Sequence, residues 1–126
     1  MRAIDTNVLV RLLARDDPKQ ALAAEDFIAP GAWVSTLVLS ESIWVLESVY
    51  GVAPSAQALA LEMLLQHRQI TLQDHETVVE ALKLFQQTKG LGFSDCLILE
   101  SARKAGHLPL GTFDRKLAKQ SDAQLI

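Results

Sequence analysis

The fold is decided between Ala32 and Tyr50, in the stretch AWVSTLVLSESIWVLESVY. Its first residues, Ala32 to Ser35, form a short apolar run that predicts a strand. From Thr36 to Tyr50 the apolar side chains continue in a segment long enough for a helix. They lie almost all round that helix, so we expect it to be buried on most sides. A strand that passes directly into a buried helix is typical of α/β folds.

The same alternation extends outward to both ends of the chain. Further strands are expected at Arg2 to Asp5, Ile70 to Leu72, Leu108 to Thr112 and Ala123 to Ile126. Further helices are expected at Asn7 to Ala14, Pro18 to Ile28, Pro54 to His67, Glu76 to Thr88 and Phe93 to Ala105, with a helical turn from Asp114 to Lys119. The sequence therefore predicts one α/β domain over residues 1–126. Its central sheet would be mostly parallel and twisted, with four to five short strands and helices on both faces.

Composition favours a small cytoplasmic protein. The 126 residues suffice for one core, and although 49% are apolar, no stretch is long enough to span a membrane. Arg2 and Asp5 interrupt the first apolar run, so it is not of the secretory type. Cys96 is the only cysteine and is expected to be a core thiol, which excludes an internal disulfide. The three histidines, at 67, 75 and 107, lack metal-ligand spacing, so zinc is not expected.

Charge is distributed unevenly along the chain. The formal net charge of −3 argues by itself against a nucleic-acid partner. The segment from Ser101 to Ile126, however, holds five basic residues against two acids, which suits either a solvated helix face or a phosphate-binding surface. The candidates for contact with RNA phosphates are Arg103, Arg115, Lys116 and Lys119.

Four carboxylates stand out by position. Asp5 and Asp114 follow the first and fourth expected strands, and strand ends of a parallel sheet share one rim. Asp95 falls in the first turn of a helix. Each of these three could instead be a helix cap or a first-turn acid. Glu41 taken alone could equally be a surface acid on its helix. Because that helix is apolar and no basic residue occurs between Lys19 and Glu62, we expect a buried charge that needs a cation.

Together these carboxylates predict a metal centre. Carboxylate oxygens without His or Cys select Mg²⁺, with Mn²⁺ as a substitute, over zinc. Such centres commonly hydrolyse phosphate esters, because the metal activates a water and stabilises the developing charge. Removing the four site acids from the total of 15 leaves 11 against 12 basic residues, so the rest of the chain tolerates a polyanion.

The acidic motifs resemble those of a known family. Ile4-Asp5-Thr6-Asn7-Val8, Ser40-Glu41, Phe93-Ser94-Asp95 and Thr112-Phe113-Asp114 are similar, in order and spacing, to the signature of PIN domains, and most closely to VapC toxins. No single motif is specific, but all four occur in register. The resemblance covers essentially the whole chain.

The resemblance implies a function and a role for each motif residue. Asp5, Glu41, Asp95 and Asp114 would be the catalytic, metal-binding carboxylates. Thr6 and Asn7 would orient the first carboxylate or a water, Thr112 would steady the site, and Ser94 would cap the helix that carries Asp95. The implied reaction is endonucleolytic cleavage of RNA with Mg²⁺. The implied partners are a VapB-like antitoxin and a second copy of the chain, as a homodimer.

Three other functions fit parts of the sequence. A structure-specific DNA nuclease of the same fold would need the same carboxylates. A phospho-receiver module would need an acidic pair directly after the first strand, but Asp16 and Asp17 come a helix too late. A non-catalytic PIN-fold protein would act only through a partner. The helix from Ser55 to Gln66 and the exposed-looking Trp33, Trp44 and Tyr50 suit either such a surface or the core.

Overall fold

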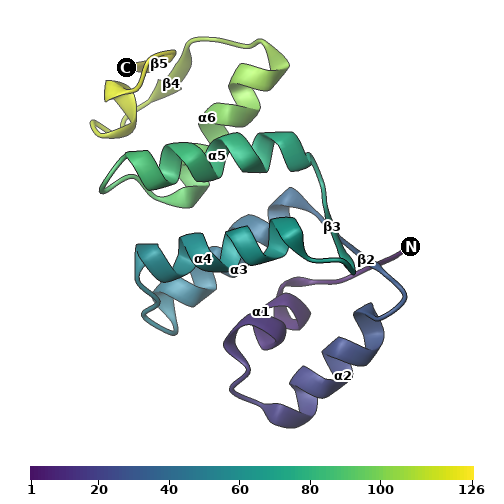
Figure 1. Cartoon of the computed structure of the whole chain (residues 1–126). Helices are drawn as coiled ribbons and strands as arrows, with labels where there is room; N and C mark the ends of the chain where they lie inside the picture. Colours follow the sequence, from purple (N-terminus) through teal and green to yellow (C-terminus); the bar gives the residue numbers. More distant parts are fainter. The chain divides into compact units, whose positions relative to one another are not determined.

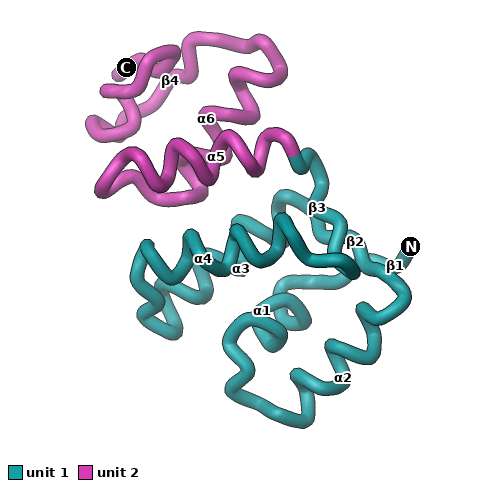
Figure 2. Tube along the Cα trace, viewed as in Figure 1, with its two compact units in different colours: residues 1–75 teal, residues 76–126 magenta.

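The structure is a computed structural model that describes all residues from 1 to 126. The chain forms two compact units, unit 1 with residues 1–75 and unit 2 with residues 76–126 (Figure 2). Each unit has its own strands, helices and buried apolar side chains. None of the helices combines the length and the apolar character that a membrane span requires.

Unit 1 is built on three parallel strands in the order β1-β2-β3 (Figure 1). Ala32 of β2 pairs with Arg2 of β1 and with Ile70 of β3. Two helices connect each strand to the next, because parallel neighbours need long crossover connections. The elements of unit 1 are β1 (Arg2–Ala3), α1 (Thr6–Ala14), α2 (Pro18–Ile28), β2 (Ala32–Val34), α3 (Thr36–Ser48), α4 (Pro54–Gln66) and β3 (Ile70–Leu72).

Unit 2 places two helices before a pair of short parallel strands. Its elements are α5 (His75–Gln87), α6 (Phe93–Ala105), β4 (Leu110–Thr112), the 3-10 helix η1 (Leu117–Lys119) and β5 (Ala123–Leu125). Phe85 of α5 and Phe93 of α6 meet edge to face, with ring centroids 5.9 Å apart. Gly106 ends α6 in a left-handed conformation with φ of 79°, as predicted for a glycine at that position.

The predicted α/β class is confirmed, and five strands form. They are divided between a sheet of three strands and a sheet of two, where the sequence predicted one sheet. Every strand has only two or three residues, so each offers few backbone groups for pairing with a further neighbour. Strand β2 ends at Val34 because the next residue, Ser35, caps helix α3 by accepting the Val38 N–H at 3.1 Å.

Helix α3 is buried on one face only, so the prediction of burial on most sides is wrong. Its buried positions are Leu39, Ser42, Ile43 and Leu46. Leu37 is 74% exposed and Trp44 is 62% exposed on the remainder of the helix. Apolar residues are common on protein surfaces, and their presence all round a helix does not by itself require burial. Trp33 and Tyr50 are also exposed, which favours the surface interpretation of these residues over the core interpretation.

Candidate functional site

Asp5 is fixed at the start of α1. Its side chain accepts the backbone N–H of Val8 at 3.1 Å, which makes it the N-cap of the helix. One carboxylate oxygen is thus used for capping, and the residue remains exposed. Thr6 and Asn7 follow it in the first turn, and neither side chain hydrogen-bonds to the Asp5 carboxylate. Of their two predicted roles, only the orientation of a water therefore remains a prediction.

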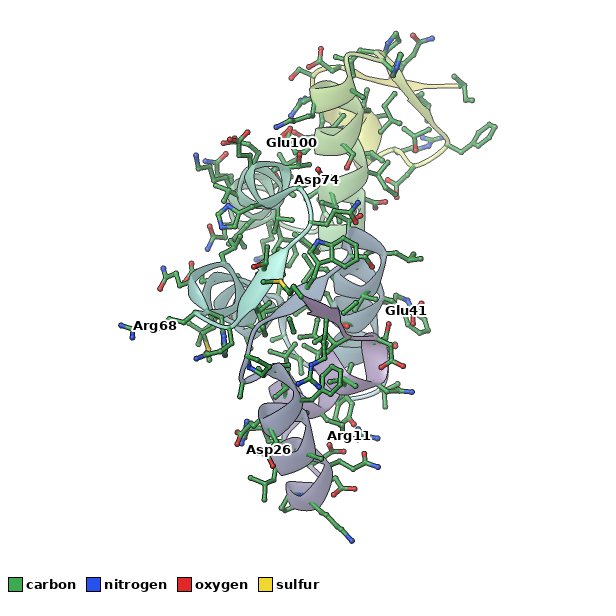
Figure 3. All side chains as sticks on the ribbon, turned by 90° about the vertical axis from the view of Figure 1, so that its right-hand side faces the viewer. Arg11, Asp26, Glu41, Arg68, Asp74 and Glu100 are labelled. Atoms are coloured by element: carbon green, nitrogen blue, oxygen red, sulfur yellow. The ribbon has the colours of Figure 1, made fainter.

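Glu41 lies on α3 and projects into solvent (Figure 3). The sequence predicted a buried charge, and this is wrong because Ser42 and Ile43 take the inward positions and leave Glu41 exposed. An exposed carboxylate is hydrated and needs no counter-ion for stability. The burial argument for a cation therefore does not apply to Glu41, and its place in a metal site rests on the family motif.

Asp95 lies in the first turn of α6 and is partly buried. The N-cap of this helix is Gly92, and no side chain caps it, so the prediction that Ser94 caps α6 is wrong. Ser94 is the second residue of the helix, because the helix begins at Phe93, whose buried ring anchors the first turn. Asp95 therefore has the helix N-terminus beside it, where the macrodipole favours negative charge.

Asp114 is held by a tight turn after β4. Its backbone N–H donates to the Thr112 hydroxyl at 2.9 Å, and its side chain accepts the N–H groups of Lys116 at 2.8 Å and Leu117 at 3.0 Å. Thr112 was predicted to steady the site; its hydroxyl holds the Asp114 backbone rather than the carboxylate, and its role in the site stays a prediction. One oxygen of Asp114 is thus committed to the turn, and the residue remains exposed.

None of these four carboxylates takes part in an ion pair within its own unit. The acids that form ion pairs include Asp16, Glu25, Glu76, Glu80, Glu100 and Asp122. Burial raises the pKa of Asp95 above its ordinary value, and the negative charge of Asp114 raises it further. Two carboxylates that repel each other and form no ion pair are suited to a hard divalent ion. Neither unit by itself gathers three or more His, Cys, Asp or Glu side chains that could hold a metal.

Replacement of Asp95 by asparagine is expected to stabilise the metal-free protein. A raised pKa means that the folded state binds a proton more readily than the unfolded chain, so ionisation of Asp95 costs stability. This cost is present in full above the raised pKa and disappears as pH falls below the ordinary value of 3.8. At pH 7 with EDTA, Asp95→Asn should unfold at a higher temperature than the parent in calorimetry.

The control for that measurement is Asp26→Asn, which removes one negative charge from an exposed position on α2. It should leave the unfolding temperature almost unchanged. An Asp95→Asn protein that is less stable than both would contradict the assignment of Asp95 as a strained carboxylate.

Arg103 is not available for RNA in this structure. Its guanidinium donates to Glu100 Oε1 at 2.7 Å, to Asp122 Oδ2 at 3.1 Å, and to the Ser121 backbone carbonyl at 2.7 Å. It thereby joins α6 to the segment before β5. These partners engage all three guanidinium nitrogens, which argues against the predicted phosphate contact at Arg103.

The other basic candidates of the C-terminal segment are exposed: Arg115, Lys116 and Lys119. None of them forms an ion pair within unit 2. The side chain of Lys116 lies over Gly90, where a Cβ atom would come within 3.2 Å of Nζ. Gly90 has φ of +87°, so its backbone conformation favours glycine, whereas the flexible Lys116 side chain could move aside. These three side chains remain candidates for phosphate contacts.

Cys96 carries no chemistry at neutral pH. Its side chain is fully buried, and burial raises the pKa of the thiol to about 12. The neighbouring charges of Asp95 and Glu100 act in the same direction. The thiol therefore stays protonated and is a core residue, as predicted.

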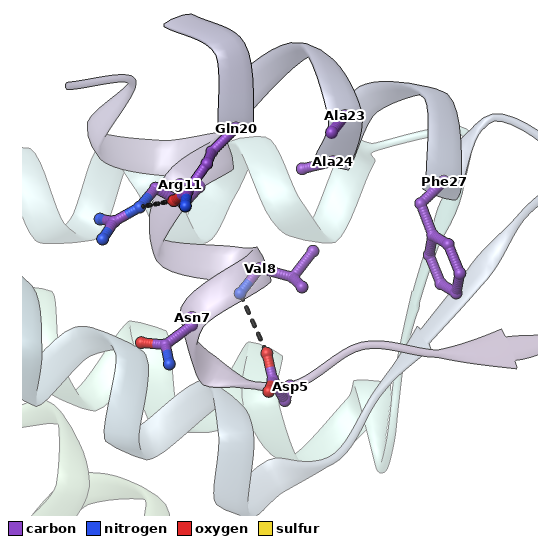
Figure 4. A pocket seen from close by; sticks show the side chains of 8 residues that line it. All are labelled: Asp5, Asn7, Val8, Arg11, Gln20, Ala23, Ala24 and Phe27. Atoms are coloured by element: carbon purple, nitrogen blue, oxygen red, sulfur yellow. Dashed lines mark hydrogen bonds between the residues drawn. The ribbon is translucent and has the colours of Figure 1, made fainter. Parts of the chain in front are cut away.

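The sequence did not single out Arg11 and Gln20, which line a cavity beside Asp5. The cavity has a volume of about 400 Å³ and lies between α1 and α2 (Figure 4). Arg11 donates to Gln20 Oε1 at 2.6 Å. The available signal was the spacing of Arg11 four residues after Asn7, which places both on one face of the helix. Charge and polarity alone gave no reason to choose them.

The fold and these side chains together define a class of protein: an α/β chain with carboxylates at two helix starts, after a strand and within a helix. The PIN domain family matches residues 3–122, a range that includes parts of both units. The chain therefore belongs to the PIN domain family. PIN domains are generally metal-dependent nucleases, which places the chain among hydrolases of the nuclease kind. No match is found among curated proteins or among solved structures.

Proposed function

We propose that this chain is a Mg²⁺-dependent endoribonuclease and the toxin of a toxin–antitoxin pair. The observation that carries the proposal is the family match over residues 3–122 together with four acidic motifs similar in order and spacing to those of VapC toxins. Residues 1–126 would form one PIN domain that works in the cytoplasm as a homodimer. A VapB-like antitoxin would hold it inactive.

The residues proposed to hold the metal are Asp5, Glu41, Asp95 and Asp114. Two belong to each unit, and none has an ion-pair partner within its unit. Oxygen ligands of this kind suit Mg²⁺, and Mn²⁺ is expected to substitute. A bound Mg²⁺ would supply positive charge at the phosphodiester and acidity to a water.

The side chains around these carboxylates would fix their positions before the substrate binds. Asp5 is held by the Val8 N–H, and Asp114 by the N–H groups of Lys116 and Leu117. In each case one oxygen is committed to the backbone. Preorganised charges of this kind need little rearrangement during the reaction, which is the main source of electrostatic catalysis. Thr6 and Asn7 would orient the attacking water, and Thr112 would steady the turn that carries Asp114.

The test is incubation of the purified chain with end-labelled total RNA in Mg²⁺, in Mn²⁺ and in EDTA. The protein must first be separated from any bound antitoxin under denaturing conditions and refolded. Cleavage in either metal that stops in EDTA would support the proposal. Absence of RNA cleavage, with cleavage of branched or single-stranded DNA under the same conditions, would overturn it in favour of a DNA nuclease of the same fold. Absence of both would favour a non-catalytic binding role.

The double substitution Lys116→Ala and Lys119→Ala is expected to weaken RNA binding. Each lysine that contacts a phosphate releases counterions on binding, so the logarithm of affinity falls with the logarithm of salt concentration. For a single strand the slope is about 0.7 per contact, so loss of two contacts should reduce it by roughly 1.4. Fluorescence anisotropy with a labelled RNA over a salt series measures this slope.

The matched control is Lys19→Ala with Arg68→Ala, which removes the same charge from exposed positions of unit 1. The control should keep the slope of the parent. Equal effects of the two double variants would mean that only net charge matters, and the C-terminal segment would lose its assigned role.

A further inference from the structure

The cavity beside Asp5 has one apolar wall and two polar ends. Its apolar lining comes from Val8 of α1 and from Ala23, Ala24 and Phe27 of α2. Asp5 and Asn7 lie at the start of α1, and Arg11 and Gln20 lie further along (Figure 4). Pockets of this volume with a few convergent polar groups are typical of sites for small ligands or for single residues of a polymer.

The polar end at Gln20 is held in one orientation. Arg11 Nε donates to Gln20 Oε1 at 2.6 Å, which leaves the Gln20 amide NH₂ as the free group of that side chain. Arg11 is itself held, because its Nη1 donates to the Tyr50 hydroxyl at 3.1 Å and forms an ion pair with Asp16 at 3.4 Å. Tyr50 completes the network by donating to Asp16 at 2.8 Å. The Gln20 amide NH₂ is thus a hydrogen-bond donor with a fixed position in the lining of the cavity.

The apolar wall offers an aromatic surface next to positive charge. Phe27 is 38% exposed, and the Arg2 guanidinium lies 4.2 Å from its ring centroid. Aromatic rings and arginine planes are the surfaces on which unpaired nucleobases stack. A fixed amide donor can meet an acceptor on the edge of such a base. These features favour a flat ring with hydrogen-bonding groups on its edge.

We propose that this cavity binds one nucleotide of the single-stranded RNA next to the bond that is cut. The proposal rests on the proposed function and assigns part of its substrate contact. Asp5 lines the cavity and is also one of the four carboxylates proposed to hold the metal. A base bound in the cavity would therefore determine which phosphodiester reaches Asp5. Gln20 and Phe27 would then help to determine the cleavage site, with Arg11 as a positioning residue.

Two variants test the cavity from opposite directions. Ala23→Leu adds volume at an exposed position that lines the cavity, and Phe27→Ala removes the ring. The matched controls are Ala105→Leu at the end of α6 and Leu22→Ala on α2, both at exposed positions outside the cavity. Circular dichroism and thermal unfolding should first establish that all four proteins fold.

Binding is measured by anisotropy with a labelled single-stranded RNA in EDTA, where no cleavage is needed. Both cavity variants are expected to lose affinity by roughly 5- to 100-fold, the range for loss of one base–aromatic contact. The controls should bind like the parent. In Mg²⁺, Gln20→Leu should also broaden the base preference at the cut site. Mononucleotides are expected to compete only weakly, because they lack the neighbouring phosphates.

Parental affinity in both cavity variants would overturn the inference, even if the chain cleaves RNA. Loss of affinity in both variants would support it, even if no cleavage occurs under any metal and the proposed nuclease fails. Mononucleotides that bind as tightly as the RNA would also overturn it, because the cavity would then be a site for free nucleotides.

Discussion

Replacement of Asp5 by asparagine is expected to lower RNA cleavage by roughly 100-fold or more, the scale of losing one preorganised electrostatic contact to the reaction. The fold should not change. In the parent the Asp5 side chain accepts the Val8 N–H at 3.1 Å, and the side-chain oxygen of asparagine can accept the same N–H. Asn and Asp are equivalent N-caps. The substitution therefore removes the negative charge alone. Single-turnover cleavage of a labelled RNA in Mg²⁺ measures the loss.

Asp17→Asn is the matched control for this experiment. Asp17 caps α2 as Asp5 caps α1, accepting the Gln20 N–H at the same distance of 3.1 Å. It lies outside the acidic motifs. Asp17→Asn should retain parental cleavage, and both variants should unfold at the parental temperature. A folded Asp5→Asn protein with parental cleavage would refute the role of this carboxylate, and an equal loss in both variants would point to helix capping.

Helix boundaries could be predicted from the sequence because their signals are local. Asp17-Pro18 predicted the start of α2, and the structure has Asp17 as N-cap and Pro18 as the first helical residue. Gly106 predicted the end of α6 in the same way. A cap needs only a side chain and a backbone N–H within one turn, so neighbouring residues carry the whole signal.

The arrangement of the strands could not be predicted in the same detail. Hydrogen bonds between strands join residues far apart in the chain, such as Ala32 and Ile70. Sequence periodicity identifies a strand but not its neighbours. The strands also proved shorter than predicted, since Ile4 and Asp5 lie beyond β1 and Leu108 lies before β4. The division into two sheets is therefore information that only the folded chain contains.

The main error in predicting the candidate site concerned the solvent exposure of Glu41. Glu41 was expected to be buried because its neighbours along the helix are apolar, yet it is exposed. The positions of Asp5 and Asp114, in contrast, followed from the strand ends. Both are helix or turn caps in the structure, so the capping interpretation holds for each of them. Capping uses one oxygen and leaves the other for a ligand, so the two roles are compatible.

Arg103→Met is expected to destabilise unit 2 by about 3 kcal/mol, the lower end of the range for breaking a buried ion pair. The substitution would leave Glu100, whose side chain is only 10% exposed, without its cation. It would also remove the hydrogen bonds to Ser121 and Asp122, which lie 18 and 19 residues further along the chain. Thermal unfolding followed by circular dichroism should show a fall in midpoint of roughly 10 °C.

Glu100→Gln in the Arg103→Met background separates the ion pair from the other contacts. A buried amide costs less than a buried carboxylate, so the double variant should be more stable than Arg103→Met alone. Arg103→Lys should fall between Arg103→Met and the parent, because lysine keeps the charge but cannot reach three partners in one plane. RNA affinity measured below the unfolding temperature should be parental in every variant. A stable Arg103→Met protein with weaker, less salt-dependent RNA binding would reverse the assignment and restore Arg103 as a phosphate contact.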